Sequence, residues 1–387
     1  MTGDPPGRPL RVGICASYDL GKAGGVNTHI RAQAAALRRL GHNVCIFGAT
    51  SAPLAADEVS LGGCVSLVIG DTETGFGIDP RSWWTSKRLL RDRRFDVLHM
   101  HEPLMPLPSW FVLWQAHVPV VATFHTYRSQ GHKWYPQYRW IFDRLMKRLA
   151  VRLAVSEAAK RTVAAHFPGE YEVVPNAIDV ERFASQAARP SLMPDGRPYV
   201  LYVGRLEPRK GIDRLMRAMA TVRRRVPCAQ LVVVGDGPDR AALEAAAHDM
   251  DAGVLFAGRV SDDDLPRFYK AADLVCSPAL GDESFGIVLL EAMAAGRPIV
   301  ATNIAGYAEL LAPAGCARLA AVDDPESLAR EICLVLEDAT VARTLGLRGA
   351  LAAKRYDWDV VARRLEEIYY GITSVRPTAS APTAGRT

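Results

Sequence analysis

The chain has 387 residues, which is too long for one typical hydrophobic core and predicts two domains. Hydrophobic residues make up 49% of it and charged residues 23%, a balance typical of a soluble globular protein. The net charge of +5 is compatible with an anionic substrate or an anionic membrane surface and does not distinguish them. The seven cysteines stand singly, without zinc-like or redox-motif spacing, and no apolar run approaches 18 residues. These features indicate a reduced compartment and exclude a membrane-spanning segment.

The first half of the chain alternates short apolar runs with amphipathic helical patterns. The runs predict strands at residues 10–15, 43–47, 96–100 and 118–124, and shorter ones at 153–155 and 172–174. The clearest helix is predicted over residues 26–40, closed by Gly41 as a C-cap. Such a βαβ rhythm argues for a parallel sheet with helices on both faces.

The rhythm pauses over residues 184–198, a polar segment without periodicity, and then restarts. Strands are predicted at 199–203, 230–234, 255–256, 274–276 and 298–301, where the pattern closes, and helices at 212–225 and from residue 239. A last amphipathic helix is predicted over 358–372, followed by a tail rich in Pro, Ala, Thr and Ser.

The expected fold is therefore α/β, with two doubly wound, Rossmann-like domains facing an interdomain cleft. The predicted boundaries are residues 1–190 for an N-terminal domain and 191–355 for a C-terminal domain. Residues 356–372 are expected to form a helix that packs back on the N-terminal domain, and residues 373–387 a disordered tail. Ligands of such sheets bind beyond the carboxyl ends of the strands.

The strongest chemical signal is a pair of carboxylates separated by seven residues, Glu283 and Glu291. The first lies in a Gly-containing loop just before a helix, and the second lies on that helix. Carboxylates accept hydrogen bonds from pairs of hydroxyls, as on a sugar ring or a ribose. By spacing alone, a structural interpretation is equally good, because acidic residues favour helix starts.

Three cations, Arg205, Arg209 and Lys210, lie within six residues, between a predicted strand and a helix. Arg offers a bidentate fork to phosphate and Lys a mobile point charge. These cations would stabilise a departing nucleoside diphosphate, which gains negative charge. The alternative is a solvated basic turn.

Two further signals lie at predicted strand ends of the first half. Gly24 and Gly25 allow close approach of a ligand to a helix N-terminus, but such a turn is weak evidence and does not match G-x-G-x-x-G. His125 ends an apolar strand at the expected cleft rim, where a lone His is more often structural than catalytic.

Two segments offer metal-ligand residue types, but in both the structural interpretation is preferred over a metal site. The first, with His99, His101 and Glu102, offers metal-ligand types at a strand end. The second, Asp262-Asp263-Asp264, resembles a metal-binding D-x-D, but Ser261 three residues before Asp264 favours a helix N-terminal cap.

Taken together, these motifs resemble glycosyltransferase family four, whose members have the GT-B fold. The similarity includes the E-x7-E element, residues 283–291, and the stretch that follows it, residues 292–296. The resemblance implies that Glu283 contacts the donor sugar, Glu291 the nucleotide ribose, and Arg205 and Lys210 the pyrophosphate. It implies catalytic roles for His125, Arg205, Lys210 and Glu283. The other implied donor-binding residues are Gly25, Val260, Ser284, Phe285, Gly286 and Ile287.

The resemblance implies that residues 1–190 form the acceptor-binding domain and residues 191–355 the nucleotide-sugar-binding domain. On the acceptor side, it implies contacts from Tyr18, Asn27 and His125. Residues 97–103, 122–126, 281–296 and 356–358 look most like family members that move mannose from GDP-mannose to the inositol of phosphatidylinositol. Rival interpretations are a soluble acceptor, such as inositol phosphate or a polysaccharide, a UDP-sugar donor, a GT-B-like epimerase, or a non-catalytic two-lobed binding protein. The family outcome is retention at the anomeric carbon, with no required metal or other cofactor.

Residues 83–94 carry basic residues beside two tryptophans, the pattern of a helix that lies on an anionic membrane. The expected membrane contacts are Trp83, Trp84, Lys87, Arg88 and Arg91. An ordinary charged helix with a core Trp is the alternative, and no nucleic-acid motif accompanies the segment. Because residues 1–9 lack the apolar run of a signal peptide, we expect a cytoplasmic enzyme that is peripheral at the inner face of the membrane.

Overall fold

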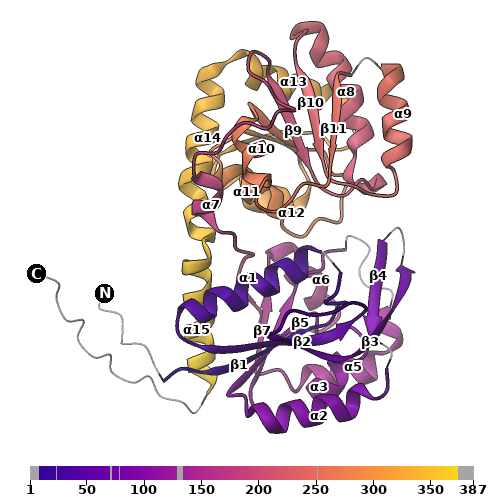
Figure 1. The fold of residues 1–387 in the computed structure, drawn as a ribbon, viewed down its shortest axis with the longest axis vertical. Helices are drawn as coiled ribbons and strands as arrows, with labels where there is room; N and C mark the ends of the chain where they lie inside the picture. Colours follow the sequence, from indigo (N-terminus) through magenta and orange to yellow (C-terminus); the bar gives the residue numbers. More distant parts are fainter. Residues whose placement is uncertain are drawn as a thin grey trace, which may run out of the picture.

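The computed structural model describes residues 8–22, 24–69, 72–77, 79–128, 134–250 and 252–373. Two α/β halves are stacked along the long axis of the molecule (Figure 1). Each half holds one largely parallel sheet with helices on both faces, so the predicted fold class is confirmed. The predicted tail lies outside the described residues, apart from Thr373.

The first sheet has the strand order β4-β3-β2-β1-β5-β6-β7-β8. Its strands are β1 (Arg11–Ala16), β2 (Asn43–Thr50), β3 (Glu58–Ile69), β4 (Thr72–Gly77), β5 (Val97–His101), β6 (Val120–Phe124), β7 (Val151–Ala154) and β8 (Glu172–Val173). All neighbours pair in parallel except β3 and β4, which form an antiparallel edge. Strands β5 and β6 are buried at every residue, as expected for strands covered on both faces.

Alternate residues of these strands enter two different cores. One core receives α1 (Gly25–Arg39) and α15 (Trp358–Ile372), and the other receives α2 (Ser82–Arg93), α3 (Ser109–Gln115) and α5 (Arg139–Met146). Three shorter helices are α4 (Trp134–Gln137), α6 (Glu157–Ala164) and α7 (Val180–Ala184).

The second sheet has the order β11-β10-β9-β12-β13-β14, all parallel. Its strands are β9 (Tyr199–Val203), β10 (Gln230–Val234), β11 (Val254–Gly258), β12 (Leu274–Ser277), β13 (Ile299–Thr302) and β14 (Ala317–Ala320). The expectation that the sheet closes with residues 298–301 is wrong, because β14 adds a strand beyond β13.

The helices of this half are α8 (Ile212–Arg225), α9 (Arg240–Met250), α10 (Leu265–Ala271), α11 (Ile287–Ala294), α12 (Ala305–Leu311), α13 (Pro325–Glu337) and α14 (Ala339–Ala353). Two 3-10 turns, η1 (Pro208–Lys210) and η2 (Lys354–Tyr356), precede α8 and α15.

The chain crosses between the halves twice, and the two crossings lie side by side. Ile178 on the first crossing pairs with Asp357 on the second. The Ile178 amide donates to the Tyr356 carbonyl at 2.9 Å, and the Trp358 amide donates to the Ile178 carbonyl at 3.1 Å. Helix α15 then runs along the N-terminal half, where it packs against α1 (Figure 1).

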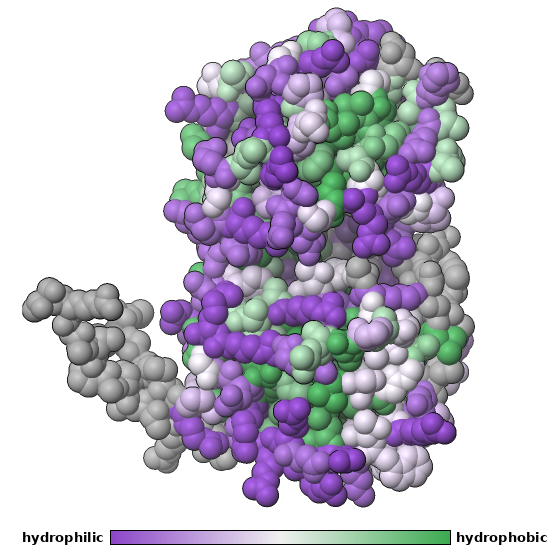
Figure 2. All heavy atoms as spheres, in the orientation of Figure 1, coloured by the Kyte–Doolittle hydropathy of each residue, from purple (hydrophilic) through white to green (hydrophobic). Residues whose placement is uncertain are grey.

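The carboxyl ends of both sheets face the junction between the halves. Helix α6 follows β7, helix α12 follows β13, and the Glu309 carboxylate of α12 accepts from the Ala158 amide at 2.9 Å and pairs with Arg161. The strand order reverses between β1 and β5 and between β9 and β12, and ligands of doubly wound sheets bind at such points. A hollow crosses the molecule between the halves (Figure 2).

Candidate active site

The cationic turn after β9 is held by a carboxylate that the sequence did not single out. Glu207 is fully buried at its side chain, and its two oxygens lie 3.0 Å from Arg205 Nε and 3.1 Å from Arg209 Nε. The buried Glu207 carboxylate therefore holds both guanidinium groups in place. Half of the Arg205 side chain, 51%, stays exposed, so its remaining nitrogens are open to a ligand.

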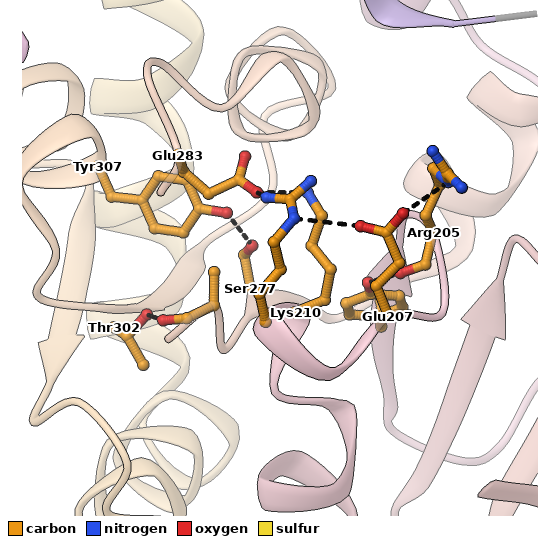
Figure 3. Close-up of polar contacts among 10 residues, drawn as sticks. Arg205, Glu207, Lys210, Ser277, Glu283, Thr302 and Tyr307 are labelled. Carbon is orange, nitrogen blue, oxygen red and sulfur yellow. Dashed lines mark hydrogen bonds and ion pairs between the residues drawn. The ribbon is translucent and has the colours of Figure 1, made fainter. Parts of the chain in front are cut away.

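The two predicted halves of the donor site meet in one ion-pair cluster (Figure 3). Lys210 Nζ lies 2.6 Å from Glu283 Oε1, and Arg209 pairs with the same oxygen. The cluster of Arg205, Glu207, Arg209, Lys210 and Glu283 contains three cations and two carboxylates, so it carries one net positive charge. The net positive charge of such a cluster attracts an anionic ligand.

The backbone explains why the turn after β9 meets the loop after β12. Gly211 has φ +68, and a Cβ there would lie 2.2 Å from the Pro278 carbonyl oxygen. Only glycine allows this approach without strain. The Leu280 amide then donates to the Arg209 carbonyl at 2.8 Å. The two loops are thus joined by their main chains, which places Lys210 beside Glu283.

The loop that carries Glu283 is supported from beneath by α12 and by the end of β12. Gly286 has φ +89 at the start of α11, and the Tyr307 ring fills the space that a Cβ would need there. The Tyr307 hydroxyl lies 2.8 Å from Ser277 Oγ, and Thr302 Oγ1 donates to the Ala279 carbonyl at 2.5 Å (Figure 3). The loop is therefore fixed before any ligand arrives.

The predicted donor contacts Ser284, Phe285 and Ile287 differ in their burial. Phe285 is 6% exposed and packs edge-on against Tyr356, with ring centroids 5.9 Å apart, so its side chain supports the loop. Ser284 and Ile287 are half-buried. Because Ile287 begins α11, free backbone amides of the helix N-terminus lie in this loop.

The second glutamate, Glu291, lies on α11 and has one protein partner of its own. The Tyr269 hydroxyl donates to Glu291 Oε2 at 2.6 Å. Burial raises the pKa of Glu291 to about 7, although the hydrogen bond from Tyr269 favours the ionised form. Tyr269 was not predicted as a site residue, because it lies on a different helix, α10.

Val260 follows β11 and lines a cavity of about 340 Å³. Ser261 Oγ accepts from the Asp264 amide at 3.1 Å and donates to Asp264 Oδ2 at 2.8 Å. The other oxygen of Asp264 pairs with Arg267 at 2.8 Å. Asp264 is therefore engaged in local hydrogen bonds and an ion pair at the start of α10, which favours the cap over a metal-binding D-x-D.

On the N-terminal side, Gly24 caps α1 and Gly25 begins it. Asn27 is 4% exposed, and its side-chain amide donates to the carbonyls of Asp19 and Lys22 at 2.7 and 2.9 Å. It thereby holds the loop after β1, which contains the half-buried Tyr18. In this conformation, the Asn27 side chain is engaged by the loop after β1. Direct contact of Asn27 with an acceptor stays a prediction.

His125, at the end of β6, belongs to a buried histidine cluster formed by His29, His99, His101 and His125. His101 Nδ1 lies 2.8 Å from His125 Nε2, and His99 Nδ1 lies 2.5 Å from the Tyr369 hydroxyl of α15. Burial lowers the pKa of every member, to about 4 for His29 and about 3 for His99. All four are therefore neutral at physiological pH.

Part of this cluster is the one group in the described ranges whose geometry would admit a metal ion. One nitrogen from each of His29, His101 and His125 lies within 4.8 Å of the others. However, His101 and His125 share a hydrogen bond, in which one ring nitrogen donates its proton to the lone pair of the other. That lone pair is then not available to bind a metal ion. The alternative group of His99, His101 and Glu102 does not converge on one point, because Glu102 accepts from backbone amides and His99 contacts Tyr369 and Thr123.

The predicted membrane helix, α2, has an inner and an outer side. Trp84 is 68% exposed, and Lys87, Arg88 and Arg91 are exposed beside it. Trp83 is half-buried, and its ring packs edge-on against Phe111 of α3, with centroids 5.3 Å apart, so it also joins α2 to α3. No helix in the described part of the chain is long and apolar enough to span a bilayer.

Two more tryptophans share this side of the N-terminal half and were missed in the sequence. Trp114 of α3 is 52% exposed and Trp140 of α5 is 64% exposed. Helix α3 packs against both α2 and α5. We refer to Trp84, Trp114 and Trp140 as the exposed tryptophans. No sequence signal marked the latter two, because their exposure depends on how the three helices pack.

Comparison with known proteins agrees with this geometry. Residues 23–182 match the family model described as Glycosyltransferase Family 4, and residues 185–352 match Glycosyl transferases group 1. Phosphatidyl-myo-inositol mannosyltransferase of Mycobacterium tuberculosis is 34% identical over 367 residues, covering 93% of this chain and 96% of that protein. D-inositol 3-phosphate glycosyltransferase of Corynebacterium urealyticum is 28% identical and covers 92% of this chain and 92% of that protein.

Among solved structures, Anabaena HepE in complex with UDP superposes with a TM-score of 0.75 at 19% identity, covering 94% of this chain and all of that one. This likeness shows the fold. Together with the two family models and the relative at 34% identity, it shows that the chain is a glycosyltransferase of family four.

Proposed function

We propose that this enzyme transfers mannose from GDP-mannose to the inositol of phosphatidylinositol, with retention at the anomeric carbon. The observation that supports the donor side is the net-positive cluster of Arg205, Glu207, Arg209, Lys210 and Glu283 at the switch point of the second sheet. The name of the mycobacterial relative supports the acceptor.

In the proposed reaction, the bond from the anomeric carbon to the diphosphate oxygen breaks, and a bond to an inositol hydroxyl oxygen forms on the same face. The hydroxyl proton passes to the departing phosphate oxygen. Arg205 and Lys210 stabilise the charge that develops on the diphosphate, and Glu283 holds sugar hydroxyls. Glu291 accepts from the ribose hydroxyls. No metal takes part in this proposal, so EDTA is expected to leave the rate unchanged.

The deciding experiment is mass spectrometry of lipids after incubation with GDP-mannose and phosphatidylinositol. The proposal expects a mass gain of one hexose on phosphatidylinositol. Parallel reactions contain inositol 3-phosphate as acceptor, or UDP-glucose as donor. Transfer to inositol phosphate alone would overturn the lipid acceptor and favour the activity named for the corynebacterial relative. Turnover with the UDP-sugar alone would overturn the donor.

The affinity for GDP-mannose is expected to rise about tenfold between pH 6 and pH 8. A carboxyl with a raised pKa of about 7 is protonated below that pH and ionised above it. The ionised form accepts ribose hydroxyls better, so binding strengthens as pH rises through 7. GDP-mannose suits this measurement by calorimetry, because its diphosphate is ionised throughout the range.

Replacing Tyr269 with Phe removes the donor that favours ionised Glu291, so the rise should move to higher pH. Tyr370→Phe is the matched control, because its hydroxyl donates to the Arg8 carbonyl far from Glu291. An affinity that stays constant from pH 6 to 8 in the wild-type enzyme would contradict the assignment of Glu291.

The membrane contact proposed for the N-terminal half extends from α2 to the exposed tryptophans. Tryptophan favours the bilayer interface, and each basic residue near an anionic surface contributes about 1 kcal/mol. The triple variant Trp84→Ala, Trp114→Ala, Trp140→Ala is expected to bind phosphatidylinositol-containing vesicles at least about tenfold more weakly in co-sedimentation.

The matched control for this prediction is the pair Leu347→Ala and Leu351→Ala. These side chains are 62% and 70% exposed on α14 of the other half, so their removal also deletes surface apolar area. Equal losses in the control and the triple variant would indicate non-specific adsorption. Unchanged binding of the triple variant would overturn this membrane face.

A further inference from the structure

Glu102 is a buried carboxylate at the acceptor side of the cleft to which neither the resemblance nor the proposed chemistry assigns a role. It follows β5, next to the switch point of the first sheet, and is 2% exposed. Its backbone has φ +54, an uncommon conformation for a residue with a side chain. Local strain of this kind persists where surrounding contacts over-determine it.

Those contacts all come from one segment of the neighbouring strand end. Glu102 Oε1 accepts from the His125 amide at 2.6 Å, from the Thr126 amide at 2.7 Å and from Thr126 Oγ1 at 2.8 Å. The Glu102 amide in turn donates to the Thr123 carbonyl at 2.9 Å. A single carboxylate oxygen thus fixes two consecutive peptide groups where β6 ends and the cleft begins.

The same carboxylate is electrostatically coupled to Tyr18. The charge of Glu102 helps to raise the pKa of Tyr18, after burial as the larger cause, and the nearby Thr126 side chain acts in the opposite direction. His101, the residue before Glu102, holds the His125 ring at 2.8 Å. Residues 101 and 102 therefore hold His125 twice, by its ring and by its backbone, and Tyr18 lies close enough for the charge of Glu102 to act on it.

We infer that Glu102 is a positioning residue of the acceptor side, which fixes the backbone of His125 and Thr126 beside the transferred sugar. This inference rests on the proposed function for its kinetic consequence. The alternative role for a carboxylate at this place is the nucleophile of a double displacement. However, all three donors bind Oε1 and come from the end of β6, which is the arrangement expected of a positioning residue.

The two roles predict opposite results for Glu102→Gln. The amide oxygen of Gln can still accept from the backbone, so a positioning residue tolerates the change, whereas a nucleophile does not. We expect Glu102→Gln to keep kcat/KM for the acceptor within about fivefold of wild type. Glu102→Ala should lower it about a hundredfold, because small displacements of a reacting group cost that much. Calorimetric affinity for GDP should be unchanged in both variants.

Hydrogen–deuterium exchange of the peptide over residues 121–128, measured without substrate, tests the geometry independently. Faster exchange is expected in Glu102→Ala and near-wild-type exchange in Glu102→Gln. Glu172→Gln is the control, because Glu172 is a surface carboxylate paired with Arg364. Inactive Glu102→Gln with unchanged exchange would overturn the inference in favour of a chemical role. If wild-type enzyme transfers no mannose to phosphatidylinositol, the proposed function fails while the exchange data still decide the role of Glu102.

Discussion

Lys210→Ala is expected to lower kcat for sugar transfer by about a thousandfold, or about 4 kcal/mol in the barrier. Lys210 Nζ lies 2.6 Å from Glu283 and supplies one of the three positive charges of the cluster. Without it, the cluster carries no net charge and loses the mobile cation that follows the departing phosphate. Initial rates at saturating GDP-mannose measure the effect.

Two companion variants make this result specific. Lys210→Arg keeps the charge but not the compact ammonium, so partial recovery is expected. Lys354→Ala, an exposed lysine of η2, should leave the rate unchanged. A Lys210→Ala enzyme with more than a tenth of wild-type kcat would remove Lys210 from the catalytic assignment.

Glu283→Ala is expected to reduce kcat by a similar factor and to leave GDP binding intact or tighter. Glu283 Oε1 is the shared partner of Arg209 and Lys210, so deleting the carboxylate frees both cations for the diphosphate. The transferred sugar loses its acceptor for hydroxyl hydrogen bonds, and such contacts matter most in the transition state. Binding of GDP, which lacks the sugar, separates the two effects.

Glu337→Gln provides the matched control, since Glu337 forms a surface ion pair with Arg225. If Glu283→Ala weakens GDP binding and transfer equally, Glu283 acts through the fold of the loop and not through the sugar. Calorimetry with GDP and initial rates with GDP-mannose together distinguish these outcomes.

The sequence predicted most of the fold because parallel strands buried on both faces are continuous apolar runs. Strand β9, strand β10 and helix α8 have the predicted bounds, and most other strands differ by one to three residues. Strands β3 and β4 were missed because glycine and polar residues interrupt them at the sheet edge. Strand β14 was missed because its four residues, Ala-Arg-Leu-Ala, carry a weak apolar signal.

The candidate site shows the same division. Glu283, Glu291, Arg205 and Lys210 were predicted because their spacing lies within single motifs. The residues that hold them, such as Glu207 and Tyr269, were not, because those contacts form only when separate elements pack. The contact between Trp83 and Phe111 was not predicted for the same reason, since Phe111 lies on a different helix, α3.

The paired crossings between the halves have a mechanical consequence. Ile178 and residues 356–358 are hydrogen-bonded to each other, so the halves are joined by two paired segments and not by a single flexible linker. Two paired connections resist rotation of one half against the other more than a single connection does. We therefore expect the two halves to approach each other by bending at this pair of connections. Truncation before Tyr356 would remove the second connection together with α15, and so it would also open a core of the N-terminal half.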